Sequence, residues 1–145
     1  MADLVYNNFK YRQLGDTSVT PINLKTDTIK LALVTSSYTP DQDAHDFWDD
    51  VSANEVSASG SYSAGGVTLT VTTSQDNTDN EGVFDASDVT ITSFTGTFRY
   101  AVIYKSTGVN STSPLICLID FGTNVSAYAG TVTITFAAEG ILNLT

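Results

Sequence analysis

Groups that carry out catalysis in many enzymes are scarce in this chain, which has one cysteine and one histidine among its 145 residues. A single cysteine excludes an internal disulfide bond, and Cys117 lies in the apolar run 115–119, where a thiol packs as a small hydrophobic group. His45 alone does not supply the several His and Cys ligands of a zinc-type site. The sequence therefore predicts no metal site, no cofactor and no enzymatic activity.

Basic residues are also scarce, since 6 Lys and Arg stand against 16 Asp and Glu, which gives a formal net charge of −10. Phosphate backbones and anionic membranes repel such a surface, so neither nucleic acid nor a membrane is an expected partner. No apolar run approaches the length that spans a bilayer, and the first residues lack the parts of a secretory signal. We therefore expect a protein that is made in a cytoplasm.

What the sequence does contain is a period-two alternation of apolar and small polar residues, which is typical of half-buried antiparallel strands. Segments 97–105 and 115–119 are apolar on both faces, which predicts central strands covered on both sides. One face of the first of these is expected to carry Phe98 together with Tyr100. The expected strands cover residues 28–36, 67–73, 82–85, 88–94, 97–105, 114–121, 130–136 and 141–145.

The predicted fold is all-β: a two-sheet antiparallel β-sandwich, of jelly-roll or immunoglobulin-like type, that occupies residues 27–145 as a single domain. One short helix is expected within it. The string 39–41 (TPD) is a helix-start signal, and apolar residues of 44–51 then recur at helical spacing for about three turns. Asp49 and Asp50 would oppose the dipole at the end of this helix, so a Lys or Arg, from this or another chain, is expected beside them.

Residues 1–26 differ from the rest because aromatic residues there are interspersed with polar ones. This segment is predicted to form an edge strand or an extended N-terminal arm that packs on a neighbouring subunit, since so many aromatic groups need a surface to cover them. The candidate partner contacts are four residues of the arm and the two acids of the helix: Tyr6, Phe9, Tyr11, Arg12, Asp49 and Asp50.

The acidic residues raise two further hypotheses that their spacing does not favour. Asp76, Asp79 and Glu81 could surround a calcium ion, but they depart from the EF-hand pattern, and a solvated hairpin tip explains the loop 76–82. A hydrolase would need a defined carboxylate pair. Nothing in the spacing singles out a pair among the other acids on or beside predicted strands, which are Asp85, Asp88 and Asp120.

Five strings that carry no reaction occur in a set order: AHDFWDDV at 44–51, AGGV at 64–67, RYAVIYK at 99–105, TSPLI at 112–116 and IDFG at 119–122. Together they resemble a group of small structural proteins of tailed bacteriophages that are similar to capsid decoration, or cement, proteins. The resemblance covers residues 27–145, and the arm matches no part of it.

This resemblance implies a non-enzymatic virion component on the capsid surface that stabilises a phage head by bridging capsid subunits. The implied partners are the major capsid protein and two further copies in a homo-trimer. An alternative is a receptor- or carbohydrate-binding module of a phage tail or fibre, in which Trp48 and the tyrosines would stack on sugar rings; a buried Trp48 would count against it. A hydrolase with two carboxylates in a deep pocket is a third hypothesis.

Overall fold

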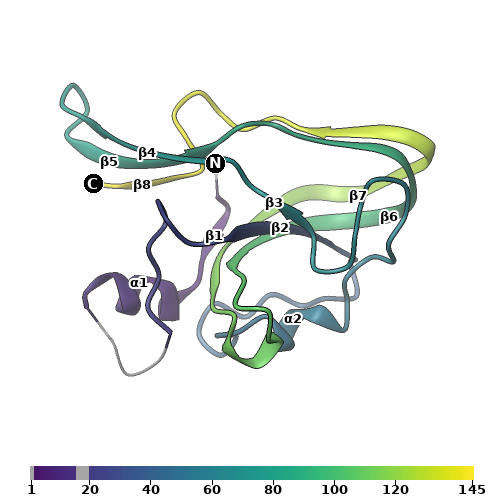
Figure 1. Ribbon diagram of the computed structural model, residues 1–145, viewed down its shortest axis with the longest axis horizontal. Helices are drawn as coiled ribbons and strands as arrows, with labels where there is room; N and C mark the ends of the chain where they lie inside the picture. The colour runs from purple at the N-terminus through teal and green to yellow at the C-terminus, as the bar shows by residue number, and fades with distance from the viewer. Residues whose placement is uncertain (1, 16–19) are drawn as a thin grey trace.

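The computed structural model describes residues 2–15 and 20–145, which form two antiparallel β-sheets (Figure 1). The five-stranded sheet has the order β1-β7-β6-β2-β3, and the three-stranded sheet has the order β4-β5-β8. The prediction of an all-β fold with two antiparallel sheets is confirmed. In chain order the elements are β1 (Leu4–Val5), α1 (Asn7–Gln13), β2 (Ile29–Val34), α2 (Asp49–Ser52), β3 (Val67–Thr68), β4 (Val71–Asp76), β5 (Glu81–Ala86), β6 (Val89–Lys105), the 3-10 helix η1 (Asn110–Thr112), β7 (Leu115–Ile134) and β8 (Leu142–Leu144).

A long ribbon of β6 and β7 runs through both layers. The sequence predicts two short strands in each of these segments, whereas the structure has single strands of 17 and 20 residues. Register shifts interrupt the pairing between Ile91 and Gly96, and Ser93 and Ala129 have positive φ angles of 54° and 46°. Because such bulges bend and twist paired strands, the ribbon curves from one layer into the other (Figure 1).

The main hydrophobic core lies between the two sheets. Leu33, Phe94, Phe98 and Ile103 are among its fully buried side chains. The sequence places Phe98 on the same face as Tyr100, but a register shift between them reverses the alternation of β6. Phe98 therefore enters the core between the sheets, and Tyr100 lies on the opposite face.

A second hydrophobic cluster covers the other face of the five-stranded sheet. Val34 of β2 and Val102 of β6 pack there with Trp48 and Val51, which belong to the segment around α2. The central strands β2 and β6 are therefore buried on both faces, as their sequences predict.

The segment expected to form a three-turn helix is mostly not helical, because only Asp49–Ser52 forms α2. Asp41 accepts two backbone N–H bonds of 3.0 Å from the residues two and three positions ahead, which closes a local turn instead of starting a long helix. Phe47 then pairs with Pro114 in an isolated β-bridge. The helical spacing still marks Trp48 correctly as a core residue, but pairing with a distant segment overrides the helix.

The N-terminal segment folds back on the sandwich. Its first strand, β1, is an edge strand, in which Leu4 pairs with Leu118 of β7. The residues that follow form α1, which differs from the extended arm that the sequence predicts. Phe9 and Arg12 lie three positions apart on the buried face of this helix, so helical spacing allows both to pack on the sandwich. Residues 1 and 16–19 of the predicted arm lie outside the described residues.

Buried hydroxyl and thiol groups predict that the fold loses stability at high pH. Burial raises the pKa of Tyr38, Tyr104 and Cys117 to about 12 each. Between their ordinary pKa values of about 9–10 and this value, the unfolded state loses protons that the folded state keeps, so the free energy of unfolding falls as pH rises. We expect the thermal unfolding midpoint to drop steeply between about pH 10 and 12, and less steeply in Tyr104→Phe. Circular dichroism measures it, and a midpoint that stays constant over this range would contradict the prediction.

Candidate partner-binding surface

The N-terminal and C-terminal segments lie close together (Figure 1). Their side chains line a groove between α1 and β8. Ala2 donates a backbone hydrogen bond of 2.9 Å to Ile141, which holds the two segments together. The groove, called the α1–β8 groove below, has a volume of about 430 Å³. Its lining comes from β1, α1 and β8 and their immediate neighbours: Val5, Phe9, Lys10, Gln13, Leu14, Leu142, Asn143 and Leu144.

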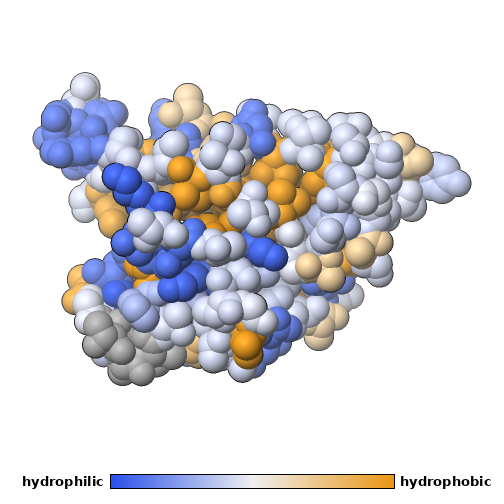
Figure 2. Space-filling model, in the orientation of Figure 1, coloured by the Kyte–Doolittle hydropathy of each residue, from blue (hydrophilic) through white to orange (hydrophobic). Residues whose placement is uncertain are grey.

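Two large aliphatic side chains of the α1–β8 groove face solvent, since Leu14 is 87% exposed and Leu144 is 57% exposed. A smaller hollow of about 160 Å³ shares Leu144 and continues past Val83 to Leu24. Figure 2 shows apolar side chains at the surface between the two layers. Apolar side chains exposed beside a groove are typical of protein–protein contacts, because their burial gains roughly 25 cal/mol per Å².

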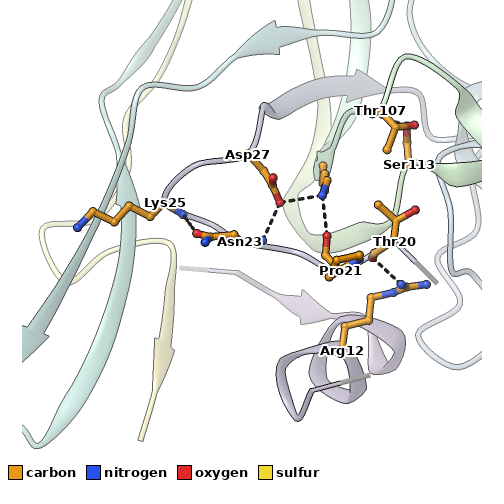
Figure 3. A network of polar contacts seen from close by, with 9 residues as sticks. Arg12, Thr20, Pro21, Asn23, Lys25, Asp27, Thr107 and Ser113 are labelled. Carbon is orange, nitrogen blue, oxygen red and sulfur yellow. Dashed lines mark hydrogen bonds and ion pairs between the residues drawn. The ribbon is translucent and has the colours of Figure 1, made fainter. Parts of the chain in front are cut away.

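A network of polar contacts holds the connection between α1 and β2 against the end of β6 (Figure 3). Lys105 Nζ forms an ion pair of 2.9 Å with Asp27 and donates a hydrogen bond of 2.6 Å to the backbone oxygen of Pro21. At α1, Arg12 donates from Nη1 to the backbone oxygen of Thr20 at 2.7 Å. These contacts fix α1, and with it one wall of the α1–β8 groove, to the five-stranded sheet.

The four contacts predicted in the N-terminal segment lie in two kinds of environment. Tyr6, Phe9 and Arg12 are at most 4% exposed, so their side chains pack inside this chain and are not surface contacts in this conformation. Phe9 contributes to the lining of the α1–β8 groove. Tyr11 is 60% exposed on α1 and stays a candidate contact.

Asp49 and Asp50 are exposed, but they lie in the first turn of α2 instead of at the end of a longer helix. Acids at this end favour the helix dipole. Asp50 Oδ2 accepts the backbone N–H groups of Asp46 at 2.9 Å and Phe47 at 3.1 Å. Within residues 2–15 and 20–145, the ion pairs that join Arg99 to Asp120 and Lys105 to Asp27 involve neither of these acids.

The other candidates for chemistry are engaged in local structure. His45 Nδ1 is hydrogen-bonded at 2.8 Å to the hydroxyl of Tyr38. Asp76 accepts backbone N–H bonds from Thr78 at 2.7 Å and Asp79 at 3.2 Å, which lowers its pKa and closes the hairpin tip between β4 and β5. Across residues 2–15 and 20–145, no group of three or more His, Cys, Asp or Glu side chains is arranged to hold a metal ion.

Among the carboxylates weighed for a hydrolase, Asp120 is paired with Arg99 through two hydrogen bonds of 3.0 and 3.1 Å. The guanidinium lowers the pKa of this carboxyl. Asp88 accepts the backbone N–H of Phe136 at 3.1 Å. The first contact joins the interiors of β6 and β7, and the second joins the segments just outside their other ends. Asp85 lies apart from both and lines a hollow of about 270 Å³ with other acids, among them Asp79, Glu81 and Glu139.

The aromatic stacking surface that a carbohydrate-binding module requires is not provided by Trp48. Its side chain is 2% exposed and stacks on Tyr104, with ring centroids 4.5 Å apart and planes 4° apart. The buried ring is an observation against this alternative.

Sequence patterns predict contacts in the segment that forms one wall of the α1–β8 groove, but they do not single out Leu14, Leu142 and Leu144. A signal for the second wall is present, because 141–145 is expected as a strand with apolar residues at alternate positions. No pattern shows that this strand ends beside α1.

In the part of the chain that the structure describes, no helix is long and apolar enough to cross a membrane. No family model matches this chain, and no curated protein or solved structure is significantly similar to it.

Proposed function

We propose that the protein is a virion structural protein that binds the surface of a phage head, as capsid decoration proteins do, and that it attaches through the α1–β8 groove. The observation that carries the attachment surface is the exposure of Leu14 and Leu144 beside one apolar groove. The strings that resemble phage structural proteins supply the assignment to a capsid. The protein needs no reactive group for this role.

The partner we propose is a segment of the major capsid protein that inserts apolar side chains into the groove. Lys10 is the one charged side chain of the groove lining, so an acidic group of that segment would lie beside it. Each copy would bridge neighbouring capsid subunits, and a homo-trimer would engage three such sites at once. Weak single contacts then combine into firm attachment, and rupture of the shell must break them.

Co-sedimentation with intact capsids and, separately, with purified tails tests this proposal. We expect the wild-type protein to sediment with capsids. The double variant Leu14→Glu/Leu144→Glu should reduce the bound fraction at least about tenfold, because two carboxylates in an apolar contact lose their hydration. Analytical ultracentrifugation of the free protein tests the proposed trimer.

Val109→Glu is the matched control, since Val109 is 56% exposed and lies in the loop between β6 and β7, outside the groove. It should bind like the wild type. Sedimentation with tails alone would overturn the assignment to the head. Equal binding of the double variant and the wild type would overturn the assignment of the groove.

A further inference from the structure

A pocket of about 480 Å³ lies on the side of the five-stranded sheet that faces away from the sandwich core, near α2 and the loop that joins β6 to β7. This volume is in the range of small-molecule sites, about 300–1,000 Å³. The α1–β8 groove shares no lining residue with it. The pocket is therefore a separate concavity.

The base of the pocket is rigid. Trp48 and Tyr104 stack face to face, and the hydroxyl of Tyr104 donates a hydrogen bond of 2.6 Å to the backbone oxygen of Gly65 at the rim. The indole N–H of Trp48 has no hydrogen-bond acceptor among the described residues. Its nitrogen is not fully sealed from solvent.

Two opposite charges line the same pocket without pairing. Glu55 is held in place because its Oε1 accepts hydrogen bonds from the Tyr62 hydroxyl at 2.8 Å and the Gly65 N–H at 2.7 Å. Its second oxygen has no hydrogen-bond partner among the described residues. Lys30 Nζ also lies near Gly65, 3.7 Å from where a Cβ would be, and neither Lys30 nor Glu55 belongs to an ion pair of the described residues. The local charge of the pocket is therefore balanced, although the chain carries −10.

We infer that this pocket binds a neutral sugar, such as the terminal hexose of a glycan. Each sugar hydroxyl both donates and accepts hydrogen bonds, and the pocket offers an acceptor in Glu55 and a donor in Lys30. The lining also includes Ser52, Ser106 and Asn110, whose side chains can both donate and accept hydrogen bonds. An anion would meet Glu55 and a cation would meet Lys30, so the balanced charges disfavour ions.

The sugar is held by hydrogen bonds to the polar lining and not by stacking on an aromatic face, because Trp48 is buried. The inference goes beyond attachment to a capsid and does not depend on it. A shell-bound protein with such a pocket would add a glycan contact to the particle surface.

Trp48 gives a direct test, because it is the one tryptophan of the chain and lines the pocket. The full chain is titrated with glucose, galactose, mannose, rhamnose and N-acetylglucosamine, and the tryptophan emission is recorded. We expect a saturable change with at least one of these sugars, at a dissociation constant of about 1 mM. Glycine betaine, a zwitterion, is titrated in parallel.

Lys30→Met and Glu55→Gln remove one charge each while preserving side-chain size. Each should weaken sugar binding at least about tenfold, and Lys30→Met leaves the hydrogen bonds of Glu55 intact. The matched controls Lys25→Met and Glu139→Gln change exposed residues outside the pocket and should bind within about twofold of wild type. Thermal midpoints show that the variants are folded. No response to any of the five sugars, saturation by betaine alone, or unchanged binding in Lys30→Met would overturn the inference.

Discussion

Gly66→Ala is expected to lower the free energy of unfolding by about 3–5 kcal/mol. Gly66 has a φ of +86°, a conformation that residues with a Cβ rarely adopt. An added Cβ would also lie 2.2 Å from the backbone oxygen of Leu31 and 2.8 Å from the Cα of Ala32. Neither atom can withdraw easily, because both belong to β2, which is paired on both sides by β3 and β6.

Gly108→Ala separates the two causes of this loss. Gly108 has the same φ of +86°, but a Cβ there meets no atom within 4 Å. Gly108→Ala should therefore lower the free energy of unfolding only through backbone strain, by about 1–2 kcal/mol. Urea denaturation followed by circular dichroism measures both variants. Equal losses for Gly66→Ala and Gly108→Ala would show that contact with β2 contributes nothing.

Phe94→Ala is expected to destabilise the fold by about 3–5 kcal/mol. Phe94 is fully buried where the β6–β7 ribbon bends, and it makes edge-to-face contacts with Tyr62 and Phe98 at centroid distances of 6.0 and 6.1 Å. Its ring also lies over Gly96, where an added Cβ would come within 2.7 Å of the ring. The variant would leave a cavity that a bent, paired backbone cannot easily close.

Phe121→Ala is the matched control for this prediction. Phe121 also contacts Phe98 edge to face, at 5.5 Å, but it is only partly buried. Phe121→Ala should lower the free energy of unfolding by clearly less, about 1–2 kcal/mol. Thermal and urea unfolding of both variants give the comparison. A loss from Phe94→Ala no larger than that from Phe121→Ala would mean that the bend does not depend on this ring.

The strands could be predicted because period-two alternation depends only on which face of a strand is buried. The bulges could not, because a register shift between Phe98 and Tyr100 depends on which residues of β7 oppose them. The same dependence on distant residues explains why the predicted three-turn helix does not form. Spacing predicts three turns, but the bridge between Phe47 and Pro114 joins segments far apart in the chain, and local preference does not include it.

The α1–β8 groove could not be predicted in full either, because it depends on contacts between distant segments. Aromatic composition draws attention to the N-terminal segment, yet helix α1 buries Tyr6 and Phe9 and leaves Tyr11 and Leu14 outside. Which residues face solvent is decided by the docking of α1, not by their hydrophobicity. The contribution of Leu144 depends on a contact between opposite ends of the sequence, which no local pattern encodes.

The β6–β7 ribbon also has a consequence for the order in which the molecule assembles. Its two strands are joined by the short loop 106–114, whereas β1 and β8 must find partners far along the chain. Short closures cost less chain entropy, so we expect this ribbon and the β4–β5 hairpin, whose loop is 77–80, to pair before the terminal segments dock. The walls of the α1–β8 groove are then also the first parts to exchange their amide hydrogens, and a bound shell would slow that exchange.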